Sequence, residues 1–158
     1  MPRNFKSTEV HLKPDPRYGS MLATKIVNKL MLDGKKTTAQ KIFYDAIDLV
    51  HKRLPDVEDQ VEIFTRAVDN VKPTVEVRSK RVGGANYQVP REVRRSRQQS
   101  LAIRWIVDNA RKKKGKPMSI RLAEEFYDAY SGQGASVSWK ENVHKMAEAN
   151  KAYSHYNR

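Results

Sequence analysis

The chain has 158 residues, no cysteine and a formal net charge of +13, because 31 lysines and arginines outnumber 18 aspartates and glutamates. This length predicts one domain, and the lack of cysteine excludes a disulfide framework and a metal site with thiolate ligands. Since no apolar run approaches the roughly 18 residues that span a bilayer, and no apolar signal segment opens the chain, we expect a soluble, cytoplasmic protein without a membrane partner.

The first 18 residues predict an extended basic arm, because they contain three prolines, scattered cations and no sustained period. Residues 19–158 predict a single helical domain. Its first helix is indicated by apolar residues at helical spacing between 22 and 31, and Asp33-Gly34 is a typical helix stop.

The next two helices follow closely. Thr37 and Gln40 fit a capping box at the start of the second helix, whose apolar face extends to Val50. A third apolar stripe begins at Val57 and is stopped by Lys72-Pro73.

Residues 75–89 alternate like a strand, and their paired glycines predict the turn of a β-hairpin. Pairing Val75 with Val89 and Val77 with Tyr87 places these four side chains on one face. Residues 80–84 would then form the turn. The cations near this turn favour an arm that projects from the body towards phosphate.

Three further helices are expected after Pro90. The fourth extends from about Glu92 to Lys113, the fifth carries an apolar stripe from residue 122 to 130, and the sixth starts near Ser136. The sixth is expected to pack through Trp139, Val143, Met146 and Ala147, with Trp139 in the core. The predicted fold is mainly α, a six-helix domain with one extended β-hairpin inserted between helices three and four.

The positive charge is concentrated in the middle of the chain. Residues 72–121 hold 15 lysines and arginines against three carboxylates, a balance of +12, whereas residues 1–71 balance at +2 and residues 122–158 at −1. A charge that served only solubility would be spread more evenly. The asymmetry therefore favours a polyanionic partner, with nucleic acid ahead of a membrane.

Three groups of cations account for most of this excess: the hairpin, the start of the fourth helix and the lysine-rich segment after it. Four arginines at a helix start oppose the helix dipole and repel one another, so their placement favours an anionic ligand. A lysine run at a helix end is by itself an ordinary solvated feature. Together with the other two groups it indicates an extended basic surface.

The sequence predicts no enzyme, no cofactor and no small-molecule substrate. The four histidines lack the spacing of metal ligands, and Glu141 with His144 is one Glu-x-x-His where a di-metal bundle needs two. The segment Gly34-Lys35-Lys36-Thr37 lacks the earlier glycine of a phosphate loop and follows a helix rather than a strand.

Four segments, in this order, carry a resemblance to the bacterial small-subunit ribosomal protein S-seven family: Asp33–Lys36, Val82–Pro90, Ala102–Trp105 and Met146–Asn150. The resemblance covers essentially the whole chain and implies a helical domain with a β-hairpin. It also implies a primary binder of the 3′ major domain of 16S ribosomal RNA that nucleates assembly of the head. The expected location is the subunit interface near the decoding centre, with exit-site transfer RNA and messenger RNA nearby. Ribosomal proteins S-nine and S-eleven are the implied neighbours.

Carried onto this chain, the resemblance implies two sets of contact residues. Those implied for ribosomal RNA are Arg3, Lys6, Lys35, Lys36, Arg78, Arg91, Arg94, Arg95, Arg97, Arg111, Lys112, Lys113, Lys114 and Lys116. Those implied to face transfer RNA at the hairpin tip are Lys80, Arg81, Val82, Gly83, Gly84, Ala85 and Asn86.

Two other functions are compatible with the same residues. A DNA-architectural protein also combines a helical body with a basic β-arm, and Val82 would be its candidate wedge. A translational repressor would bind a messenger RNA through the same surface.

Overall fold

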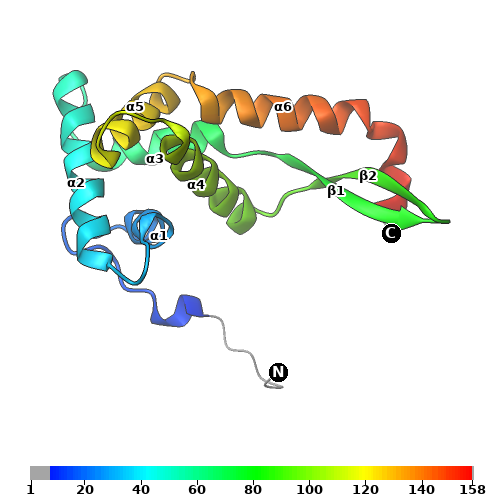
Figure 1. Cartoon of the computed structure of the whole chain (residues 1–158), viewed down its shortest axis with the longest axis horizontal. Helices are drawn as coiled ribbons and strands as arrows, with labels where there is room; N and C mark the ends of the chain where they lie inside the picture. The colour runs from blue at the N-terminus through cyan, green and yellow to red at the C-terminus, as the bar shows by residue number, and fades with distance from the viewer. Residues whose placement is uncertain (1–7, 158) are drawn as a thin grey trace.

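The structure, a computed structural model, describes residues 8–157. Within this range it contains six α-helices and a two-stranded antiparallel hairpin (Figure 1). The elements are the 3-10 helix η1 (Thr8–His11), α1 (Met21–Leu30), α2 (Lys36–Arg53), α3 (Gln60–Val71), β1 (Val75–Val82), β2 (Ala85–Glu92), α4 (Arg95–Lys112), α5 (Met118–Tyr130), α6 (Ala135–Ala149) and the 3-10 helix η2 (Lys151–Asn157). The predicted six-helix fold with a hairpin between the third and fourth helices is confirmed.

Helices α1 to α5 form a body, and the hairpin projects from one end of it (Figure 1). Helix α6 leaves the body and runs along the hairpin, and η2 then turns back onto β2. The C-terminal part of the chain therefore packs along the hairpin as far as Lys80 and Tyr87, and the tip extends beyond it (Figure 1). None of the helices within residues 8–157 is long and apolar enough to cross a bilayer.

Three phenylalanines form the centre of the body core. Phe43, Phe64 and Phe126 come from α2, α3 and α5 and are fully buried. The ring centroid of Phe43 lies 5.7 Å from that of Phe64 and 6.2 Å from that of Phe126, both in edge-on geometry. Burying each such side chain contributes roughly 1.5–3 kcal/mol, so this cluster holds α2, α3 and α5 together.

A buried carboxylate holds the segment before α1 on the body. Asp15 is 3% exposed and accepts hydrogen bonds from the backbone N–H groups of Arg17 and Tyr18. The Tyr44 hydroxyl donates to it at 2.9 Å. Burial first, and this hydrogen bond second, raise the pKa of Tyr44 to about 12. Residues 15–18 of the predicted arm therefore rest on α2, whereas Arg3 and Lys6 lie outside the described residues.

The hairpin has a different register from the predicted one. Val75 pairs with Glu92, Val77 with Pro90 and Lys80 with Tyr87, so the strands extend to residue 92 rather than 89. The turn consists of the two glycines at 83 and 84, with φ of 57° and 88°. Positive φ at both central residues is the requirement of the two-residue turn that matches strand twist. The observed register differs from the predicted one by three residues. Because this is an odd number, it changes which side chains share a face.

Three further predictions were wrong in detail. Helix α4 begins at Arg95 because Arg91 and Glu92 belong to β2. Helix α2 begins at Lys36 with Lys35 as its N-cap and no side-chain capping bond, so the capping box at Thr37 does not form. Trp139 is 47% exposed rather than in the core, and its ring lies 5.3 Å from Lys112 Nζ on the surface of α4.

Candidate nucleic-acid interface

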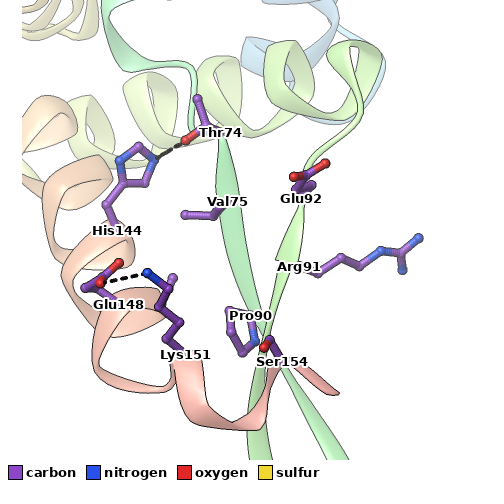
Figure 2. A pocket seen from close by; sticks show the side chains of 10 residues that line it. Thr74, Val75, Pro90, Arg91, Glu92, His144, Glu148, Lys151 and Ser154 are labelled. Carbon is purple, nitrogen blue, oxygen red and sulfur yellow. Dashed lines mark hydrogen bonds and ion pairs between the residues drawn. The ribbon is translucent and has the colours of Figure 1, made fainter. Parts of the chain in front are cut away.

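Three of the predicted arginines meet where the hairpin joins α4. Arg78, Arg91 and Arg94 are exposed and line one hollow, although they come from β1, β2 and the residue that caps α4. Figure 2 shows the Arg91 side chain pointing away from α6, on the outer side of the hairpin. Arg95 follows as the first residue of α4 and is also exposed. Folding thus gathers guanidiniums that are up to 17 positions apart in the sequence.

The start of α4 offers unpaired backbone donors to an anion. Arg94 makes no side-chain capping bond, and the first turn contains no acidic residue. The first N–H groups of a helix lack partners within the helix, and its dipole favours negative charge there. Exposed arginines around such an end create a local positive potential suited to phosphate.

Arg97 differs from its neighbours because it is bound to a carboxylate. Its Nε donates to both oxygens of Glu76, at 2.8 and 2.9 Å, and its Nη2 lies 2.8 Å from Oε2. These contacts raise the pKa of Arg97 above its usual value. This side chain joins α4 to β1 and is less available to RNA than Arg94 or Arg95.

The hairpin tip carries the predicted exposed cations. Arg81 and the residues from Gly83 to Asn86 are exposed, while Val82 is partly covered. The Lys80 Nζ donates at 2.7 Å to the carbonyl of Tyr156 in η2. Lys80 therefore links the hairpin to the C-terminal segment, and Arg81 presents its charge to solvent.

The lysine-rich segment is engaged mostly in contacts within the protein. Arg111 donates to the carbonyls of Lys29 and Leu30 at the end of α1. Lys113 lies 3.1 Å from the buried Glu125 carboxylate. Lys112 and Lys116 are exposed but have partners. Lys112 contacts Asn109 and the Trp139 ring, and Lys116 pairs with Glu124. The hydrogen bond from Lys116 lowers the pKa of Glu124.

Two predicted groups remain apart from the hairpin junction. Lys35 and Lys36 are exposed at the start of α2, in the connection from α1. Lys114 is exposed and has no ion pair among residues 8–157. The described structure thus places free cations at the hairpin junction, the tip, the start of α2 and Lys114.

An aromatic cluster on the hairpin was not predicted. The Tyr87 ring centroid lies 5.1 Å from that of Tyr153 and 5.2 Å from that of Tyr156. The sequence feature that could have indicated this cluster is the spacing of Tyr153 and Tyr156, which are three residues apart in a helical segment. Pairing them with Tyr87 required knowledge of the path of η2.

A hollow between α6, η2 and the base of the hairpin shows how α6 is attached (Figure 2). The backbone N–H of Thr74 donates to His144 Nε2 at 3.1 Å. Burial, with a smaller contribution from the Lys140 charge, lowers the pKa of His144. In this hydrogen bond Nε2 is the acceptor, so that nitrogen carries no proton. Among residues 8–157, no group of three His, Asp or Glu side chains is arranged to hold a metal ion.

Comparison with known proteins shows which family this chain is similar to. The sequence profile described as "Ribosomal protein S7p/S5e" matches residues 2–151. Proteins named "Small ribosomal subunit protein uS7" are similar over nearly the whole chain. That of Rhodopirellula baltica is 53% identical over 150 residues, covering 95% of this chain and 96% of its own. That of Nitratiruptor sp. is 57% identical over 143 residues, covering 90% and 91%. That of Carboxydothermus hydrogenoformans is 53% identical over 156 residues, covering 99% of both.

Proposed function

Because this chain belongs to the ribosomal protein S7p/S5e family, we propose that it is a structural, RNA-binding component of the small ribosomal subunit and a primary binder of 16S ribosomal RNA. Its target is the 3′ major domain, where binding nucleates assembly of the head. The family is one of structural ribosomal proteins rather than enzymes. The observation that carries the proposal is the gathering of exposed arginines where the hairpin joins α4.

The junction suits a folded RNA in two ways. Its arginines can bind phosphates, and they can also stack on unpaired bases through their planar guanidiniums. Their backbones belong to the two strands of the hairpin and to the start of α4, so the fold fixes the spacing between them. RNA helices are recognised largely by their shape and through backbone contacts. A hairpin that protrudes beside a helical body offers a surface that can fit the shape of a folded RNA.

The remaining basic residues extend this surface. Lys35, Lys36 and Lys114 contribute further phosphate contacts, and Arg3 and Lys6 contribute from the N-terminal arm of residues 1–18. Residues 80–86 at the hairpin tip face exit-site transfer RNA beside the messenger RNA, near the decoding centre. Ribosomal proteins S-nine and S-eleven are the proposed neighbours.

The salt dependence of binding to a folded transcript of the 3′ major domain tests this proposal. Arg94→Gln with Arg95→Gln is compared with Lys41→Gln with Lys52→Gln, which removes two exposed charges from α2 outside the proposed surface. The slope of log K against log salt should fall by about two in the first variant, since each phosphate contact contributes about one. The α2 variant should keep the native slope.

Two results would overturn the proposal. One is an equal change of slope in both variants, which would mean that only the overall charge matters. The other is tighter binding of the native chain to duplex DNA than to the transcript at the same salt concentration.

A further inference from the structure

A third hollow lies between the hairpin and η2. It has a volume of about 380 Å³ and is lined by Arg78, Ser79, Lys80, Val89, Arg91 and Tyr156. Small-ligand sites commonly measure roughly 300–1,000 Å³. The hollow is therefore large enough to receive part of a nucleotide.

The lining is positive and contains no carboxylate. Glu76, Arg78 and Lys80 alternate along β1, so they share one face of the hairpin, and Arg91 pairs with Glu76 across the strands. Glu76, the acidic residue on this face, is already bound by Arg97. Within residues 8–157, neither Arg78 nor Arg91 forms an ion pair.

The aromatic wall of the hollow is held in place. The Tyr156 ring centroid lies 4.0 Å from that of His155, 5.2 Å from Tyr87 and 6.4 Å from Tyr153, with the last pair stacked at 14°. Its carbonyl also accepts the hydrogen bond from Lys80. Tyr156 as a whole residue is only partly covered. A fixed ring that remains accessible loses little freedom when a ligand stacks on it.

The hollow continues into the arginine-lined one at the start of α4. Arg78 and Arg91 line both hollows. The one at the start of α4 is also lined by Arg94 and by two carboxylates, Glu92 and the Arg97-bound Glu76. Positive charge therefore predominates along a path from α4 across the base of the hairpin to η2. A groove that combines such a path with an aromatic ring suits a strand of nucleic acid better than an isolated anion.

From this arrangement we infer that η2 and the hairpin form a binding groove for a short single-stranded segment of RNA. The Tyr156 ring stacks on an unpaired base, and Arg78 and Arg91 bind the adjoining phosphates. This inference rests on the proposed function and adds to it a named base-binding residue and the chemical class of the target, an unpaired nucleotide.

The test measures binding of the full-length chain to a single-stranded RNA hexamer and to an abasic hexamer of the same charge. The native chain should prefer the hexamer with bases, and Tyr156→Leu should weaken that binding about tenfold, as expected for loss of one stacked base. Binding to the abasic hexamer should be unchanged. Tyr156→Phe, which keeps the ring, should retain the preference.

Tyr153→Leu is the matched control, because Tyr153 belongs to the same aromatic cluster but does not line the hollow. It should keep most of the preference for bases. The inference is overturned if Tyr156→Leu binds like the native chain, if both leucine variants lose the preference equally, or if polyglutamate displaces the hexamer as well as unlabelled RNA does. Binding of the 3′ major-domain transcript is measured in parallel. If the chain binds the transcript but does not prefer the hexamer with bases over the abasic one, the groove is disproved while the proposed function stands.

Discussion

Arg97 and Glu76 form an ion pair that joins the first turn of α4 to β1, with Nε to oxygen distances of 2.8 and 2.9 Å. Glu76 is 14% exposed and Arg97 is 54% exposed. The pair spans the junction at which the hairpin leaves the body. Arg97 therefore has a structural contact, whereas the neighbouring arginines at the start of α4 remain free to bind RNA.

The first prediction contrasts Arg97 with Arg94. Arg97→Gln should destabilise the fold by up to about 1 kcal/mol, because a well-oriented but largely exposed pair contributes little more. Arg94→Gln should leave stability within about 0.5 kcal/mol of native but reduce the salt slope of RNA binding by about one. Urea unfolding and RNA titration measure the two effects. The opposite pattern, with Arg97→Gln the more harmful to RNA binding and neutral to stability, would contradict the assignment.

The second prediction concerns Glu125, which accepts hydrogen bonds from the backbone N–H and the hydroxyl of Ser136. Glu125→Ala should cost about 1–3 kcal/mol of unfolding free energy, because it leaves these buried donors without an acceptor. Glu124→Ala, which removes the partner of the exposed Lys116, should cost less than about 1 kcal/mol. Chemical denaturation of both variants makes the comparison. Equal losses would show that burial of the carboxylate is not what distinguishes them.

The third prediction follows from His144, whose pKa is lowered by burial in the folded chain. Near its ordinary pKa of about 6.5, the unfolded chain binds a proton and the folded chain does not. The contribution of His144 to the unfolding free energy is therefore fully present above about pH 6.5. It falls as the pH decreases towards the pKa of His144 in the folded chain. His144→Gln should remove this dependence.

The measurement is the unfolding free energy of native and His144→Gln chains across that pH range. The difference between the two curves isolates His144 from the other histidines. A difference that stays constant with pH, or that grows in the opposite direction, would refute the interpretation.

How much of this could be predicted from the sequence depends on the range of the interactions. The hairpin and six helices followed from local period and turn residues, such as the paired glycines. The hairpin register was wrong because alternating residues fit several pairings, and the two-residue glycine turn decides among them. The exposure of Trp139 could not be anticipated, because an apolar stripe on α6 does not reveal which of its residues the other helices cover.

The candidate site shows the same limit. The arginines around the start of α4 were identified from their order in the sequence alone. Arg111 contacts α1 and Lys113 contacts α5. Nothing in the sequence indicates that these residues meet. Charge runs therefore located the basic surface, whereas tertiary contacts determine which of its members remain available.

The fourth prediction addresses the hairpin tip. Deleting residues 80–86 should leave affinity for the 3′ major-domain transcript largely intact, because the junction arginines remain. Retention of exit-site transfer RNA by subunits that contain the variant should change. Filter binding and transfer RNA release assays distinguish these effects. Loss of most ribosomal RNA affinity would reverse the division of roles between junction and tip.

The most direct test of the central claim uses the absence of cysteine from the chain. Ser96→Cys places one thiol in the hollow at the start of α4, and Lys52→Cys places one on α2 as a control. Each carries a photoreactive group in reconstituted small subunits, and the crosslinked nucleotides are mapped. We predict that residue 96 crosslinks to the 3′ major domain of 16S ribosomal RNA more strongly than residue 52. Crosslinks to that RNA from residue 52 but not from residue 96 would contradict the account.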